Sequence, residues 1–191
     1  MRLIETSDVL DIAAYEKVRD DYRRRAMAEK AVRRLAVGPL ITVFFENRGT
    51  MLYQLQEIMR AERLVHDEQI ANEMKVWNEL IPADDELSLT LMVEETDLSK
   101  AKETLRRLKD LEESVSLAIG ARTVRATFDQ NWRDENRISA VQFIRFQLDP
   151  DDRRAFLTAP DVRFVIDHEH YGHEARLPDS MLAALRADLE S

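Results

Sequence analysis

The amino-acid sequence predicts an α+β fold, in which a mixed or antiparallel sheet of about five strands is covered by a long N-terminal helix and by further helices. Apolar residues recur every three or four positions in some segments and every second position in others, which indicates helices and strands respectively. The strand-like segments do not alternate strictly with the helical ones, and this disfavours a doubly wound parallel sheet. No linker or repeat interrupts the 191 residues, so we expect a single domain over residues 1–191.

Five elements are expected in the first half of the chain. The apolar spacing indicates a helix over 9–36, a strand over 40–45, helices over 50–63 and 67–80, and a strand over 87–93. Asp8 is a suitable N-cap for the first helix, and Gly38-Pro39 is expected to end it. The run 40–45 is short, apolar and rich in β-forming residues, which is typical of a buried strand.

The second half is expected to contribute three strands and three helices. The pattern indicates a helix from 97 or 99 to 113, a strand-like segment over 115–128, a strand over 138–148, a short helix, a strand over 162–166 and a helix over 182–189. In the segment 115–128 the apolar positions switch from odd to even around Gly120, which predicts a bulge or a tight turn. Both faces of 138–148 carry apolar residues, so this strand is expected near the centre of the sheet.

The composition excludes several kinds of site. The chain has no cysteine, and therefore no disulfide, thiolate zinc site, iron–sulfur cluster or cysteine nucleophile. Its four glycines cannot form a dinucleotide-binding G-x-G-x-x-G motif or a P-loop. No apolar run approaches the roughly 20 residues of a membrane helix, and the N-terminus lacks the apolar core of a signal peptide. We therefore expect a cytoplasmic protein without a membrane segment.

One polar cluster follows the first predicted strand. Glu46 and Glu57 are candidates for a catalytic acid–base pair or for ligands of a shared divalent metal. Arg48, Gln54 and Arg60 are candidates for binding an anionic ligand, because guanidinium groups grip anions bidentately. The alternative is a solvated helix face on which Glu57 and Arg60 form an ordinary i,i+3 ion pair. The sequence leaves open whether the protein is an enzyme.

A second cluster holds three of the four histidines, His168, His170 and His173, within six residues. His168 and His170 continue the buried side of the predicted strand 162–166, and Gly172 allows a turn that brings His173 round. With a neighbouring carboxylate, these imidazoles are candidate ligands of zinc, iron or manganese. The alternative is a polar strand end capped by hydrogen-bonded histidines.

The charge of the chain is unevenly distributed. The formal net charge is −9, but residues 17–34 carry a local charge of +5, which leaves −14 on the remainder. This basic stretch is suited to an anionic ligand or an acidic partner, or to pairing with its own fold or with a second subunit in a homo-oligomer. Its one aromatic residue, Tyr22, belongs to the apolar face of the predicted helix, so no aromatic side chains are left for stacking and nucleic-acid binding is disfavoured.

Several runs of the sequence together resemble a bacterial family, the domain of unknown function numbered 3501. The resemblance rests on residues 37–48 with Thr50, Gln54, Glu57, Arg60 and Glu62, and on residues 78–82, 87–92, 139–143 and the final histidine-bearing strand. It covers nearly the whole chain. The family pattern favours proline where this chain has Glu169, so the geometry around His170 is expected to be particular to this protein.

The resemblance implies a genomic neighbourhood rather than an activity. Members of the family tend to be encoded beside rubrerythrin-like proteins and iron–sulfur oxidoreductases. This favours a metal-binding accessory protein in iron-linked or peroxide-related redox metabolism, with a rubrerythrin-like or iron–sulfur protein as its partner and no cluster of its own. The alternative hypothesis is a non-enzymatic binding or scaffold protein for an anionic ligand or an acidic partner protein.

Overall fold

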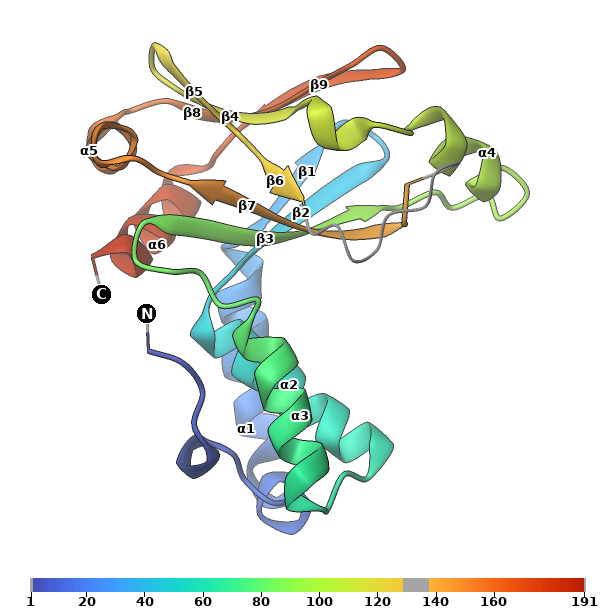
Figure 1. The fold of residues 1–191 in the computed structure, drawn as a ribbon, viewed down its shortest axis with the longest axis vertical. Coiled ribbons are helices and arrows are strands. Elements are labelled where there is room, and N and C mark those ends of the chain that lie inside the picture. The colour runs from blue at the N-terminus through green and yellow to red at the C-terminus, as the bar shows by residue number, and fades with distance from the viewer. Residues whose placement is uncertain (1, 129–137, 191) are drawn as a thin grey trace.

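The computed structural model describes residues 2–128 and 138–190 and confirms the α+β class (Figure 1). The helices are α1 (Ile12–Ala31), α2 (Arg48–Glu62), α3 (Asp67–Asn78), α4 (Ala101–Arg107), α5 (Pro150–Thr158) and α6 (Asp179–Leu189), with the short 3-10 turns η1 (Thr6–Asp8) and η2 (Leu111–Glu113). The strands are β1 (Arg34–Val37), β2 (Ile41–Glu46), β3 (Glu86–Val93), β4 (Val115–Ile119), β5 (Arg122–Arg125), β6 (Thr127–Phe128), β7 (Val141–Gln147), β8 (Val162–His168) and β9 (Tyr171–Arg176). In the part of the chain so described, no helix is both long and apolar enough to cross a membrane.

The strands form two antiparallel sheets instead of the one sheet of about five strands that the sequence suggested. One sheet has the order β1-β2-β3-β7-β6 and the other the order β5-β4-β8-β9. Gly120 makes the tight turn between β4 and β5 with a φ of +59°, as the parity switch predicted. Strand β7 lies between β3 and β6, which agrees with its apolar character on both faces.

The main core lies between the two sheets. Alternate residues of each strand point inward and meet those of the facing sheet, as where the rings of Phe146 and Phe164 pack edge to face with centroids 5.9 Å apart. Phe156 of α5 and Leu185 of α6 belong to the same cluster, so these helices extend the core beyond the strands. Burial of this apolar surface is the main force that holds the two sheets together.

Helices α1, α2 and α3 form a helical arm that projects from the sheets (Figure 1). The arm has its own apolar cluster, in which Met51, Leu55 and Met59 of α2 pack with Ile4. Phe143, on the face of β7 that points away from the inter-sheet core, packs against this second cluster. The five-stranded sheet therefore contacts apolar groups on both of its faces.

Helix α1 and strands β1 and β9 depart from the sequence prediction. The first helix ends at Ala31 rather than near 36, and residues 34–37 form strand β1. Leu35 and Val37 are buried in pairing with β2, and this burial overrides the helical pattern. Asp11, rather than Asp8, caps α1 by accepting a hydrogen bond from the amide of Ala14. Strand β9 was not predicted, because an edge strand with the sequence YGHEAR lacks a regular apolar alternation.

A buried tyrosine joins the edges of the two sheets. The Tyr171 hydroxyl, on β9, donates to the carbonyl of Val37 at 2.6 Å and accepts from the amides of Leu40 and Ile41 at 3.0 and 3.1 Å. Gly38 sits in this β1–β2 turn with a φ of +71°. A Cβ atom at Gly38 would lie 2.6 Å from the Tyr171 oxygen, so only glycine fits the turn without displacing the phenol.

We predict that Gly38→Ala destabilises the protein more than Gly120→Ala does. Both glycines have positive φ, and a Cβ in that conformation costs about 1–2 kcal/mol, but only Gly38 also meets a neighbouring side chain. The free energy of unfolding, measured by urea denaturation, should fall by at least about 1 kcal/mol more for Gly38→Ala because of this overpacking. Equal losses in the two variants would contradict the packing argument.

Candidate functional site

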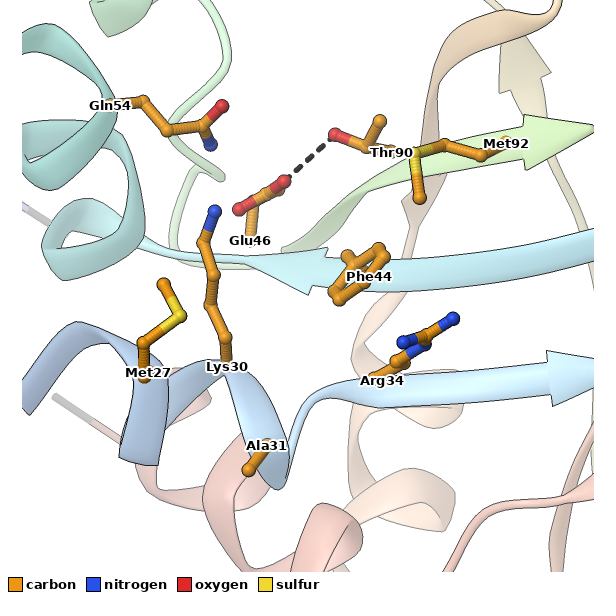
Figure 2. A pocket seen from close by; sticks show the side chains of 9 residues that line it. All are labelled: Met27, Lys30, Ala31, Arg34, Phe44, Glu46, Gln54, Thr90 and Met92. Atoms are coloured by element: carbon orange, nitrogen blue, oxygen red, sulfur yellow. Dashed lines mark hydrogen bonds between the residues drawn. The ribbon is translucent and has the colours of Figure 1, made fainter. Parts of the chain in front are cut away.

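A pocket of about 440 Å³ lies between the end of α1, the start of α2 and the outer face of the five-stranded sheet (Figure 2). Val43 and Phe45 of β2 point into the inter-sheet core, so the alternate residues Phe44 and Glu46 point outward. Nine residues line the pocket: Met27, Lys30, Ala31, Arg34, Phe44, Glu46, Gln54, Thr90 and Met92. Its volume is within the range typical of small-molecule sites.

Strand register places the outward residues side by side across three strands. Phe44 is paired with Arg34 of β1 on one side and with Thr90 of β3 on the other. Cross-strand partners point to the same face of a sheet, so these three side chains form one wall of the pocket. Lys30 and Gln54 approach this wall from the helical arm (Figure 2).

Glu46 supplies a buried carboxylate to the pocket. Glu46 is only 5% exposed, and each of its carboxylate oxygens accepts one hydrogen bond from a hydroxyl group. Thr50 donates at 2.6 Å and Thr90 donates at 2.8 Å. Among residues 2–128 and 138–190, no Lys, Arg or His nitrogen lies within 4.0 Å of a Glu46 carboxylate oxygen, so no ion pair forms there.

Two cationic side chains border the same pocket. The Lys30 ammonium lies 5.6 Å from the centroid of the Tyr53 ring, and Figure 2 shows its stem directed toward Glu46. The Arg34 guanidinium carbon lies 5.4 Å from the centroid of the Phe44 ring, and one of its nitrogens is 3.3 Å from Glu94. Met27, Phe44 and Met92 add apolar surface to the lining, beside the polar side chains of Gln54 and Thr90. The pocket therefore offers positive charge, an apolar surface and a buried acceptor together.

A buried arginine fixes the chain segment that carries these cations. Arg33 lies between Lys30 and Arg34, is 4% exposed, and donates two hydrogen bonds to Asp188 of α6 at 2.5 and 3.0 Å. Asn47, the N-cap of α2, donates to Glu29 at 2.6 Å and to Asp188 at 3.3 Å. The end of α1, the start of α2 and the last turns of α6 are thus joined by one polar network.

The anion-binding residues predicted from the sequence are only partly brought together. Gln54 lines the pocket, whereas the two arginines do not. Arg48 pairs with Asp8 at 2.5 Å and holds the N-terminal segment, and Arg60 pairs with Glu16 of α1 at 2.5 Å. Their positive charges are used to join elements of the fold.

The two predicted carboxylates are also separated. Glu57 accepts hydrogen bonds from both ends of the Arg19 guanidinium fork at 2.8 Å and from the Tyr15 hydroxyl at 2.7 Å. The hydrogen bonds from Arg19 are the main reason why the pKa of Glu57 is below its ordinary value, and the bond from Tyr15 lowers it further. Burial is the main cause that raises the pKa of Tyr15, and its hydrogen bond to Glu57 is the next largest cause. Glu57 joins α1 to α2 and is not among the residues of the pocket that holds Glu46.

The histidines lie apart from the pocket, at the β8–β9 hairpin. The Nε2 atom of His168 is 2.8 Å from the carbonyl of Lys109, and its Nδ1 atom accepts from the amide of His170 at 3.2 Å. The exposed His170 is 3.2 Å from Glu169, while the His173 ring packs on that of Tyr171 with centroids 4.4 Å apart. Over the described ranges, no three His, Asp or Glu side chains are grouped as a metal site would need.

Several pocket residues were not singled out from the sequence. Lys30 and Arg34 were recognised only as part of the basic stretch 17–34, and Met27, Thr90 and Met92 were not considered. The outward positions of β3 could have been found from the alternation of 87–93. Arg34 could not, because its place depends on strand β1, which the helical pattern concealed.

We predict that Glu57→Gln lowers the free energy of unfolding at pH 7 by about 1–2 kcal/mol, because a charge-assisted pair is replaced by weaker bonds. The pKa of Glu57 is lower in the folded state than in the unfolded state, where it is about 4.3. Ionised Glu57 therefore stabilises the fold at pH values above about 4.3, and this stabilisation is lost as the pH falls through the folded-state pKa. The difference between wild type and variant, from urea denaturation between pH 7 and 3.5, should therefore shrink below about pH 4.3.

Glu16→Gln is the matched control, because Glu16 also joins α1 to α2 but is half exposed in its pair with Arg60. Exposed pairs contribute little, so its effect should stay below about 1 kcal/mol. A pH-independent loss in Glu57→Gln would contradict the assigned role of the carboxylate.

Comparison with known proteins places this fold among proteins that lack an assigned activity. No curated protein is significantly similar to the chain. A crystal structure of a novel protein of unknown function from Burkholderia pseudomallei K96243 is similar with a TM-score of 0.91 and 27% sequence identity, over 98% of this chain and 99% of that chain. The family model described as "Protein of unknown function (DUF3501)" matches residues 3–189. The resemblance noted in the sequence is thereby confirmed, and the chain belongs to the DUF3501 family.

Proposed function

We propose that this protein binds a small anionic molecule with an apolar body in the pocket lined by Lys30, Arg34 and Phe44. The observation that carries the proposal is the presence of two cationic groups beside apolar side chains in one cavity of about 440 Å³. Ligand sites typically combine a mainly apolar lining with a few placed polar groups. This corresponds to the anionic-ligand hypothesis from the sequence, but Lys30 and Arg34 take the place of Arg48 and Arg60.

Arg34 is the group best suited to receive the anion. Its side chain is 54% exposed and its partner Glu94 is 43% exposed, so the ion pair between them is a weak surface contact. An incoming carboxylate or phosphate could take the place of Glu94 at little cost. The guanidinium would then bind the anion bidentately, which a lysine alone cannot do.

The chain segment that carries Lys30 and Arg34 is held in place by the protein before a ligand binds, and this supports binding. Arg33 is buried and bonded to Asp188, so the chain turn that carries Lys30 and Arg34 is fixed to α6. Preorganisation of this kind lowers the entropy lost on binding. The proposal assigns a binding function and leaves the reaction, if one occurs, open.

The metal-binding hypothesis, with a rubrerythrin-like partner, stays a prediction from the sequence and its family resemblance. Both ring nitrogens of His168 are within hydrogen-bond distance of backbone atoms, and one of these contacts would have to break before that imidazole could bind a metal. Elemental analysis of protein purified without a histidine tag tests it. Metal that is lost in a His168→Ala, His170→Ala double variant would favour this hypothesis.

We predict that 3-phenylpropionate and phenyl phosphate raise the melting temperature of the wild-type protein in proportion to their binding, since a ligand that binds only the folded state stabilises it. Arg34→Gln should weaken the better of the two by about tenfold or more in calorimetric titration, because a charged hydrogen-bond partner is lost.

Arg24→Gln is the control variant. Arg24 lies on α1 in an exposed pair with Asp21 and does not line the pocket. Arg24→Gln and Arg34→Gln each remove one positive charge from the protein, so any general effect of net charge on binding would appear in both variants. The absence of a thermal shift at millimolar concentration with both compounds and with L-phenylalanine, which carries a carboxylate on the same phenyl body, would overturn the proposal. Equal weakening by Arg24→Gln and Arg34→Gln would overturn it as well.

A further inference from the structure

We infer that the ligand is a zwitterion, with a protonated amine that binds Glu46 in addition to the anionic group that binds Arg34. This inference rests on the proposed function and specifies the chemical class of its ligand. The class is that of small amino acids with an apolar substituent. Three features of the pocket carry the inference: the acceptor capacity of Glu46, the lack of an ion pair to it among the described residues, and the apolar surface beside it.

Glu46 has acceptor capacity that the described residues do not fill. A carboxylate offers about four lone-pair positions, and within residues 2–128 and 138–190 only the hydroxyls of Thr50 and Thr90 donate to it. Both donors are neutral, and the residue is only 5% exposed, so water does little to stabilise the charge. A buried carboxylate is stable when it is paired with a cation, and a ligand amine would supply one.

The cationic residues of the pocket do not meet this need. Among the described residues no ion pair to Glu46 forms, although Lys30 extends in its direction (Figure 2). Arg34 lies farther along the wall, over the ring of Phe44 and beside Glu94. The wall therefore presents a negative group near the start of α2 and a positive group near the start of β1, which is the charge pattern of a site for a zwitterion.

The same arrangement discriminates against a simple anion. A carboxylate ligand without an amine must enter next to the Glu46 carboxyl group and gains nothing from it, since two carboxylates in a partly buried site repel each other. A ligand with both groups is attracted at both ends. Its apolar substituent can lie against Met27, Phe44 and Met92, where thioether and aromatic side chains accept varied shapes. Selectivity thus comes from attraction and repulsion together.

Three matched probes test this inference by isothermal titration calorimetry: L-phenylalanine carries both charges, 3-phenylpropionate carries only the anion, and 2-phenylethylamine carries only the cation. Wild-type protein should bind L-phenylalanine at least about tenfold more tightly than either of the others, as expected when one charged hydrogen-bond pair is removed. The wild-type comparison alone decides whether the ligand class is correct.

Two variants then assign the preference to its residue. Glu46→Gln should remove the preference for L-phenylalanine over 3-phenylpropionate while leaving 3-phenylpropionate bound. Glu94→Gln is the matched control, because it removes a carboxylate beside Arg34 that does not line the pocket. It should leave the ratio of the two affinities unchanged. Circular dichroism of the unliganded variants confirms that they fold.

The outcomes separate this inference from the proposed function. If 3-phenylpropionate binds wild type as tightly as L-phenylalanine, the zwitterion is wrong and the anion site stands. If L-phenylalanine is preferred and the preference survives in Glu46→Gln, the assignment to Glu46 is wrong. If neither acid binds, or if 2-phenylethylamine binds best, both the proposed function and this inference are overturned.

Discussion

The buried guanidinium of Arg33 is the constraint on which the site depends. A charge this far from water must be paired, and Asp188 of α6 pairs with it while Asn47 links both Asp188 and Glu29. A buried ion pair adds little net stability compared with apolar groups of the same size, but removal of one partner costs about 3–5 kcal/mol. Its effect is geometric: the helix α1 must end, and strand β1 must begin, at a fixed place relative to α2 and α6. The pocket lies directly beside that place.

The contrast between Glu46 and Glu57 shows how neighbours decide what a carboxylate does. Glu57 accepts from Arg19 and Tyr15, so its charge is neutralised within the fold and its pKa is lowered. Among the residues that the structure describes, Glu46 accepts only from two threonine hydroxyls, which are neutral donors and provide no opposite charge. The first arrangement joins two helices. The second leaves electrostatic attraction available to a ligand.

Elements with a long, regular period could be predicted from the sequence, while sites made by tertiary contact could not. The pattern identified α2, α3 and β3 from the spacing of their apolar residues, and β2 because it is a short apolar run rich in β-forming residues. It identified the cluster after β2 because polar residues follow a buried strand. It joined β1 to the first helix, since four residues of strand are too short to show a period of their own. That error also concealed the position of Arg34. Glu46 and Gln54, both in the predicted polar cluster, line the same pocket. The partners of Arg48 and Arg60 lie more than 30 residues away in the chain, and no local pattern reveals them.

The pocket lies where the helical arm meets the five-stranded sheet, and this position would link ligand binding to the stability of the fold. Lys30 and Gln54 come from the helical arm, whereas Arg34, Phe44 and Glu46 come from the five-stranded sheet. A ligand that fills the pocket therefore contacts both parts and adds to the contacts of Arg33 and Phe143 that already cross the boundary. Because such a ligand binds only when arm and sheet are in their native positions, its binding free energy adds to the free energy of unfolding. The position of the arm on the sheet thus matters for the proposed binding as well as for packing, since neither part forms the pocket alone.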